Sequence, residues 1–170
     1  MVFAPLPEET GPCGYFPDRQ SKTGRFYAEE LGEGELDLFI SRGFRHFGPL
    51  FFLPRCGGCG KCLPLRVEVP RFSPGSSERR VLRKGEGLSV SIGGPEPSRE
   101  AFDLYSRHLK RFGDRGGGSY TSFRDAFFHP FPFSRQLSIW KEGRLVCVCH
   151  FDETISSLSA VYTYWDEDFA

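Results

Sequence analysis

The chain has 170 residues, of which 39% are hydrophobic and 15% aromatic, and its formal net charge is zero. It is long enough for one sizeable domain or two small ones. No apolar run approaches the roughly 20 residues that cross a bilayer, and the N-terminal MVFAPLPEETGP lacks the basic start and apolar stretch of a signal peptide. We therefore expect a soluble cytoplasmic protein with no membrane partner.

The predicted elements of the first half are short. Residues 1–33 show little periodicity and are predicted as loop with at most one strand. GEGELDLFISRG predicts a short helix that ends at Gly43, and FRHFGPLFFLP predicts two strands around a tight turn at Gly48 and Pro49. In LPLRVEV, residues 63–69, apolar and polar side chains alternate as they do in a half-buried strand.

The second half predicts helices followed by strands. SPGSSERRVLRKGEG predicts a helix that begins near Ser76 or Ser77 and ends by Gly85, and GLSVSIG predicts a strand. SREAFDLYSRHLKRFG is the strongest helix pattern, with Ser98 as N-cap. GDRGGGS is predicted as a connector and SYTSFRDAFF as a second helix. RQLSIWKEGRLVCVCHFD predicts a hairpin that turns at Glu142 and Gly143, and LSAVYTYW a last strand. This order favours an α+β fold.

The zero net charge hides a strong asymmetry. Residues 42–84 contain ten Lys or Arg and two acidic residues, whereas the preceding stretch is acidic and the last twenty residues contain no base. A basic middle between acidic ends indicates a face that meets a polyanion. A solvated basic surface without a partner is the alternative.

The motif CGGCGKC predicts a metal site. Cys56, Cys59 and Cys62 stand three residues apart, and the glycines between them let the backbone turn tightly around one ion. Clustered cysteines in a cytosolic chain bind metal more often than they form disulfides. The spacing leaves zinc and an iron–sulfur cluster open. Reduced thiols in a loop are the alternative.

A tetrahedral site or a cluster needs a fourth ligand. Cys13 is the first candidate, because the glycine and proline around it are typical of a turn. His46 and His129 are rival candidates. The remaining cysteines, Cys147 and Cys149, lie two apart in an alternating segment and are predicted to pack in the core.

Together these motifs resemble the N-end aminoacyltransferase family, the arginyl-tRNA–protein transferases and their bacterial leucyl-transferring relatives. The family begins with a cysteine, an aromatic residue and proline, as in CGYFP. The stretch ISRGFRHFGPLFFLPRCGGCGKCLPLRVEVPRFSPGSSERRVLRK is similar to a family segment that has a Gly-Phe-Arg turn, an aromatic strand, the cysteines, a Pro-x-Arg strand and a Ser-x-x-Arg-Arg helix. RLVCVCHFDETISSLSAVYTYWDEDFA resembles the start of the family's acetyltransferase-like (GNAT) core. The likeness covers roughly residues 13–170.

The resemblance implies an enzyme that moves leucine or arginine from charged tRNA to protein N-termini beginning with Asp or Glu, in the N-degron pathway. The basic middle would bind tRNA phosphates, and an arginine would pair with the acidic acceptor side chain. The candidates for these two tasks, which the sequence does not divide, are Arg45, Arg66, Arg79 and Arg80. Tyr162 and Tyr164 are candidates for the reaction cleft, with strand packing as the alternative. Aminolysis of an ester needs positioning and a stabilised oxyanion, so no catalytic cysteine is expected.

The resemblance also implies an organisation in two lobes. Residues 1–72 would form an N-terminal lobe with the cysteine cluster, and residues 73–170 a partial GNAT-like lobe. The second lobe is expected to be partial because the family continues past the position of Ala170 with a serine-leucine-glycine loop, a long helix and further strands. His46 stands where relatives often have a second arginine. This replacement of arginine by histidine would adjust the contact with an anion.

Two classes of function remain open. The first is the transferase. The second is a non-catalytic metal-bearing module, or a fragment of such a transferase, that binds tRNA or degron peptides or senses redox state. A zinc-ribbon nucleic-acid binder outside the family leaves LSAVYTYWDEDF unexplained. The sequence does not indicate an oligomeric state.

Overall fold

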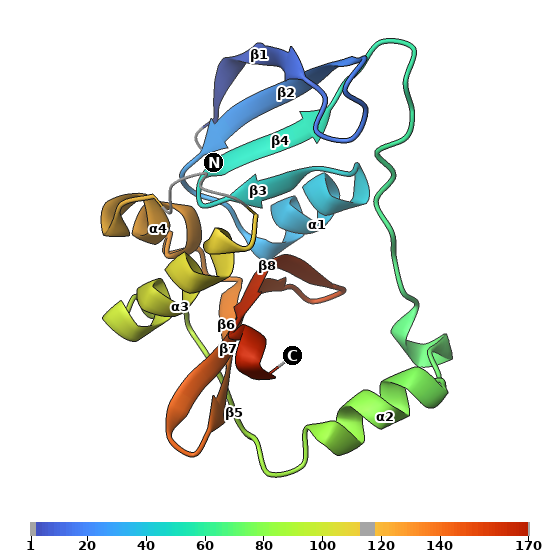
Figure 1. The fold of residues 1–170 in the computed structure, drawn as a ribbon. Helices are drawn as coiled ribbons and strands as arrows, with labels where there is room; N and C mark the ends of the chain where they lie inside the picture. Colours follow the sequence, from blue (N-terminus) through green and yellow to red (C-terminus); the bar gives the residue numbers. More distant parts are fainter. Residues whose placement is uncertain (1–2, 113–117, 170) are drawn as a thin grey trace.

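The computed structural model describes residues 3–112 and 118–169, and in them the chain forms two antiparallel four-stranded sheets and four α-helices (Figure 1). The chain is therefore a mixed α and β protein. Most of the predicted connector, residues 113–119, lies outside the described residues. The elements in chain order are β1 (Phe3–Pro12), β2 (Gln20–Ala28), α1 (Glu33–Ser41), β3 (Arg45–Phe47), β4 (Leu50–Pro54), α2 (Ser76–Lys84), β5 (Ser89–Gly93), α3 (Arg99–Lys110), α4 (Tyr120–Phe127), β6 (Ser134–Lys141), β7 (Arg144–Glu153) and β8 (Leu158–Trp165).

The first sheet has the strand order β1-β2-β4-β3. The expectation of a loop with at most one strand over residues 1–33 was wrong, because β1 and β2 form a long antiparallel pair there. β1 is largely exposed and β2 is mostly half-buried, so neither strand shows a clear apolar alternation. Backbone pairing with β1 on one side and β4 on the other defines β2. The turn expected at Gly48 and Pro49 does join β3 to β4.

Aromatic side chains build the core of the first sheet. Helix α1 lays Leu36, which is fully buried, against the sheet. Phe26 and Phe51 stack with centroids 5.2 Å apart, and Phe39 packs against both. Such aromatic pairs add to the stabilisation from burial alone. This core positions β3 and β4 and therefore the loop that follows β4.

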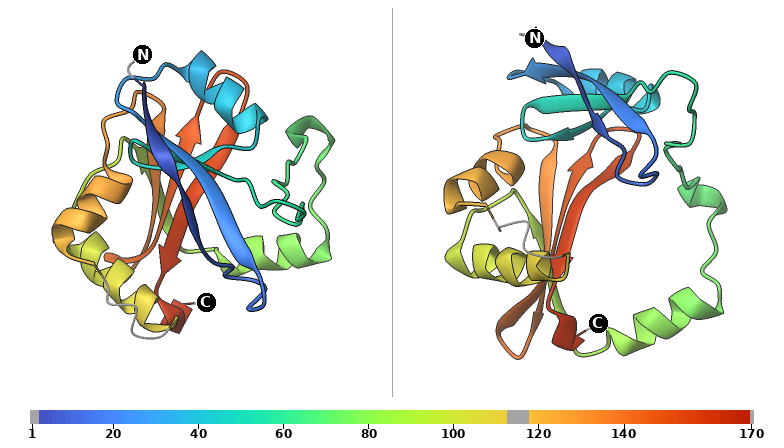
Figure 2. Two further views of the ribbon diagram at one scale, coloured as in Figure 1. Left: turned by 90° about the horizontal axis from the view of Figure 1, so that it is seen from above. Right: turned by 45° about the horizontal axis from the view of Figure 1, so that its top comes forward.

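The second sheet has the order β5-β6-β7-β8, and α3 and α4 cover one of its faces (Figure 2). The strongest predicted helix is confirmed as α3, and the Ser98 hydroxyl accepts a hydrogen bond from the Ala101 amide, as an N-cap does. The β6–β7 hairpin turns at Glu142 and Gly143 as expected, with φ of 50° and 78° at the two residues. Such left-handed pairs suit two-residue hairpins.

An extended arm, residues 61–88, connects the two sheets on the side of the second sheet opposite α3 and α4 (Figures 1 and 2). The strand predicted for residues 63–69 was wrong. Residues 61–68 are irregular and exposed, and Leu65 is 89% exposed. Alternation stabilises a strand only where another strand can pair with it, and among the described residues none does so here. Helix α2 begins at Ser76 as predicted, and β5 begins two residues after Gly87, the start of the predicted strand.

The two sheets meet through side chains. Phe131 and Phe133, which precede β6, pack into the core of the first sheet. On α1, the Asp37 carboxylate accepts hydrogen bonds from three hydroxyls of the β7–β8 loop; the donors are Thr154, Ser156 and Ser157. The predicted lobe boundary at residue 72 falls within the arm and stays a prediction. No helix in the described part of the chain is long and apolar enough to cross a bilayer.

Candidate functional site

The topology of the first sheet places the four predicted metal ligands around one cavity. Strands β1 and β4 both pair antiparallel with β2. They therefore run in the same direction, and their C-terminal ends lie at the same end of the sheet. Cys13 follows β1 and Cys56 follows β4. Cys13 and Cys56 line a cavity of about 570 Å³ at that end of the sheet, together with Cys59 and Cys62. We call this space the cysteine cavity.

The thiols in this cavity have polar surroundings. The backbone amide of Lys22 donates to Cys56 Sγ at 3.3 Å, and Arg19 Nη1 lies 3.6 Å from Cys59 Sγ. A backbone hydrogen bond from Lys61 lowers the pKa of Cys59, and Arg19 lowers it further. This is the environment that favours a thiolate. Across the described residues, no three Cys, His, Asp or Glu side chains are grouped closely enough to hold an ion. The metal therefore stays a prediction.

Arg45 borders the same cavity from β3. Its side chain is half-buried, and it also lines a second cavity of about 250 Å³ between β3 and β8. Among the described residues it forms no ion pair, and its nearest hydrogen bond is a 3.5 Å contact with the Phe44 carbonyl. A half-buried guanidinium without a carboxylate partner is a ready binding group for an anion.

Further cations and aromatic rings complete the cavity wall. Arg19 and Lys61 add positive charge, and Tyr15, Phe16 and Phe52 add aromatic surface. Sequence analysis did not single out Arg19, because it lies in the acidic first part of the chain. Its position six residues after Cys13, within the β1–β2 turn, was the available signal. The cavity suits a small ligand with one anionic group.

The structure separates the four candidate arginines. Arg66 Nη2 donates to the Ser41 carbonyl at 2.8 Å and ties the arm to the end of α1. Arg79 and Arg80 lie on α2, which has no buried residue. Only Arg45, of the four, lines the cysteine cavity.

The candidate tyrosines lie in the core of the second sheet. Tyr164 is 0% exposed, its hydroxyl lies 3.2 Å from His150 Nε2, and burial raises its pKa. Tyr162 is half-buried and packs against Tyr105 and Phe127. This arrangement favours the packing interpretation of both residues over a catalytic one.

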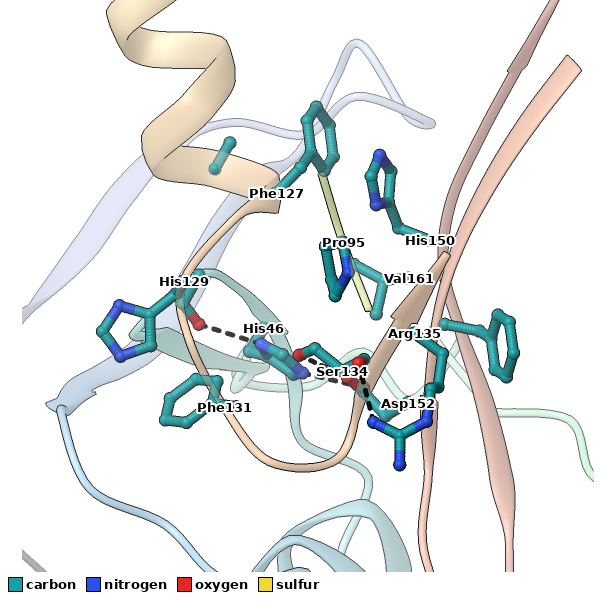
Figure 3. A pocket seen from close by; sticks show the side chains of 13 residues that line it. His46, Pro95, Phe127, His129, Phe131, Ser134, Arg135, His150, Asp152 and Val161 are labelled. Atoms are coloured by element: carbon teal, nitrogen blue, oxygen red, sulfur yellow. Dashed lines mark hydrogen bonds and ion pairs between the residues drawn. The ribbon is translucent and has the colours of Figure 1, made fainter. Parts of the chain in front are cut away.

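Neither histidine proposed as a rival fourth ligand borders the cysteine cavity. His46 lies between the sheets, where Nδ1 donates to the Gly48 carbonyl at 2.9 Å and Nε2 lies 2.8 Å from Asp152 Oδ2 (Figure 3). His129 Nε2 lies 3.2 Å from the Glu29 carbonyl. The His46–Asp152 pair joins residues 106 positions apart, and no sequence signal pointed to it.

Comparison with known proteins places the chain in a family. Residues 11–80 match the family model described as "Arginine-tRNA-protein transferase, N terminus", and residues 100–170 match the corresponding C-terminus model. The chain thus belongs to the N-end aminoacyltransferase family, whose members are aminoacyl-tRNA–protein transferases. The resemblance inferred from the motifs is confirmed.

Three relatives that match are named aspartate/glutamate leucyltransferase. The protein of Pseudomonas fluorescens strain SBW25 is 32% identical over 158 residues, which are 91% of this chain and 67% of the relative. That of Pseudomonas entomophila is 34% identical over 162 residues, 92% and 68% of the two chains. That of Helicobacter hepaticus is 29% identical over 164 residues, 93% and 68%. The chain therefore spans about two thirds of the length of these relatives.

Proposed function

We propose that the chain transfers leucine or arginine from charged tRNA to proteins that begin with Asp or Glu. The observation that carries this proposal is Arg45, a half-buried cation that faces an aromatic-walled cavity and pairs with no carboxylate among the described residues. The name shared by the relatives favours leucine as the transferred residue and Asp or Glu as the acceptor.

The acidic acceptor side chain would enter the cysteine cavity and pair with Arg45. A guanidinium can bind both carboxylate oxygens at once, which gives direction as well as energy. Arg19 and Lys61 would strengthen the field around it. Partial burial weakens screening by water, so such a pair contributes more than one on the open surface. A neutral Asn or Gln side chain would lack this attraction.

The reaction is aminolysis of an ester. The acceptor α-amine, once it has lost its proton, attacks the carbonyl carbon that links the amino acid to the terminal ribose. A new C–N bond forms, the C–O bond to the ribose breaks, and the ribose oxygen leaves with a proton. The protein must hold the amine and the ester in line and stabilise the oxyanion that forms between them.

The remaining parts of the chain would support this chemistry. We infer that the sheet β5–β8 with α3 and α4 is a partial GNAT-like lobe. Zinc or an iron–sulfur cluster held by Cys13, Cys56, Cys59 and Cys62 would tie the β1–β2 turn to the loop after β4 and so shape the wall beside Arg45. Because charged tRNA is a cytoplasmic substrate, the proposed site of action is the cytoplasm.

The test is a transfer assay with anaerobically prepared protein. Labelled Leu-tRNA or Arg-tRNA is mixed with peptides that begin with Asp, Glu or Asn. We expect label in the Asp and Glu peptides only. Arg45→Gln should raise KM for the Asp peptide about tenfold or more, since a tenfold change corresponds to about 1.4 kcal/mol, and should narrow the preference for Asp over Asn.

Arg124→Gln is the matched control, because Arg124 is exposed and pairs only with its neighbour Asp125 in the described structure. It should leave KM unchanged. Binding of tRNA and peptide without transfer would identify the non-catalytic module instead. An unchanged preference for Asp over Asn in Arg45→Gln would remove Arg45 from acceptor recognition.

A further inference from the structure

Helix α2 separates its charged and apolar residues onto opposite sides. With 3.6 residues per turn, the four cations of the helix fall on one side, and its acid and two apolar residues fall on the other. The cations are Arg79, Arg80, Arg83 and Lys84. The two apolar residues, Val81 and Leu82, are 63% and 68% exposed. We call the first side the basic face and the second the apolar face.

In the part of the chain that the structure describes, no carboxylate neutralises the basic face. None of its four cations forms an ion pair among the described residues; Arg79 Nη1 donates to the Pro74 carbonyl at 2.5 Å. No residue of α2 is buried, and the helix stands apart from both sheets (Figures 1 and 2). A nine-residue helix is marginal in water without contacts. In the described residues, concentrated positive charge therefore lies on a helix that packs against neither sheet.

Arg45 and the basic face differ in the anion that they suit. Arg45 is half-buried and set in a bounded cavity, where it can pair with one carboxylate. The basic face is open, fully solvated and repeats its charge along the helix, which fits an extended polyanion that needs several weak contacts at once. The flanking arm carries the same sign, with Arg66 and Lys61 both exposed.

We propose that the basic face of α2 docks the phosphate backbone of the tRNA, with Arg80, Arg83 and Lys84 as the contacting residues. The proposal rests on the proposed function and deepens it, because it assigns the tRNA to the arm and leaves the acidic acceptor to the cysteine cavity. Such contacts release counterions, so affinity falls steeply with salt and does not depend on base sequence. Arg79 would hold the start of the helix through Pro74 and contribute less.

The test compares a triple variant with a double variant of the 170-residue chain. Arg80→Gln/Arg83→Gln/Lys84→Gln removes the basic face, and Val81→Gln/Leu82→Gln changes the opposite side of the same helix while keeping its charge. Binding of fluorescent deacylated leucine tRNA is followed by anisotropy at several salt concentrations. The basic-face variant should bind at least about tenfold more weakly and lower the slope of log affinity against log salt by about 2 to 3.

The control variant should bind tRNA with the affinity and slope of the parent protein. Both variants should bind the Asp peptide as the parent does. All residues changed are exposed, so both variants are expected to fold.

Each other outcome overturns the proposal. If the basic-face variant binds tRNA with the parent's affinity and slope, α2 is not the docking helix, and the proposed function stands on the acceptor cavity. If the apolar-face variant loses as much affinity, contact with the basic face is not the cause. If the parent binds no tRNA, the proposed function fails as well. Binding to phosphatidylglycerol vesicles is measured in parallel. If the basic-face variant loses vesicle binding but keeps the parent's affinity for tRNA, the basic face binds anionic lipid and the proposal is wrong.

Discussion

On β7, His150 carries an ionisable ring into an aromatic core. The ring is 3% exposed and stacks on Phe127 with centroids 4.8 Å apart. Its Nε2 lies near the Tyr164 hydroxyl, and within the described structure Nδ1 has no hydrogen-bond partner. Burial lowers the pKa of His150 to about 3, so the folded protein keeps the ring neutral at physiological pH.

This residue sets a pH dependence of stability. Between the pKa of an unfolded histidine, about 6.5, and the folded value, the unfolded chain binds more protons, so the free energy of unfolding falls as pH falls. The limiting slope is about 1.4 kcal/mol per pH unit. His150→Phe keeps the stack and removes the titration, so urea unfolding between pH 6.5 and pH 4 should show a flatter dependence. The same slope in both proteins would contradict this origin.

The cysteines give a second prediction at the scale of single residues. Cys59→Ser removes one proposed ligand and should lose bound metal and lower the melting temperature, because ligand loss opens the link between the β1–β2 turn and the loop after β4. Cys149→Ser is the matched control, since Cys149 lies on β7 and borders no part of the cysteine cavity. Elemental analysis of anaerobically prepared protein is the measurement. Full metal retention in Cys59→Ser would argue against the site.

At the scale of elements, local signals predicted most helices and strands. Helix α3 carries its own N-cap and apolar periodicity, so its start and length could be predicted from residues within one turn of each end. The segment 63–69 shows the limit of such signals. Its alternation is that of a strand, but pairing depends on a neighbour elsewhere in the chain, and the arm has none among the described residues. The prediction for residues 1–33 was wrong in the opposite sense. Strands β1 and β2 form there by pairing with each other, although their sequences show no strand pattern.

Only the local part of the candidate site could be predicted from the sequence. The spacing of Cys56, Cys59 and Cys62 lies within seven residues and could be recognised directly. That Cys13 lines the same cavity follows from β1 and β4 running parallel beside β2, which is a property of the sheet. Arg45 and Arg80 also differ in burial, since Arg45 is half-buried and Arg80 is exposed. Neither residue type nor position in the sequence distinguishes a cavity arginine from a solvent-facing one.

At the scale of the whole molecule, the His46–Asp152 pair joins the two sheets. His46 extends from β3 and Asp152 from β7, and both are buried (Figure 3). Asp152 also lies within 3.5 Å of the Ser134 hydroxyl. A buried carboxylate with these donors is costly to remove, because the remaining polar groups cannot reach water.

Asp152→Ala should therefore destabilise the chain by about 3 kcal/mol or more, measured by urea unfolding at pH 7. Glu153→Ala is the matched control, because Glu153 is the adjacent residue and its carboxylate, which pairs with Arg135, is exposed. That change should cost less than about 1 kcal/mol. Equal losses in the two variants would show that the buried pair contributes nothing beyond an exposed one.

The arm has a consequence for how the chain tolerates being cut. It supplies the covalent connection between the two sheets, yet the sheets are joined side by side through Phe131, Phe133, the His46–Asp152 pair and the hydroxyls around Asp37. A protease that cleaved once within the exposed residues 61–68 would break the chain without breaking that junction. The nicked protein would travel as one particle under native conditions and as two fragments once denatured.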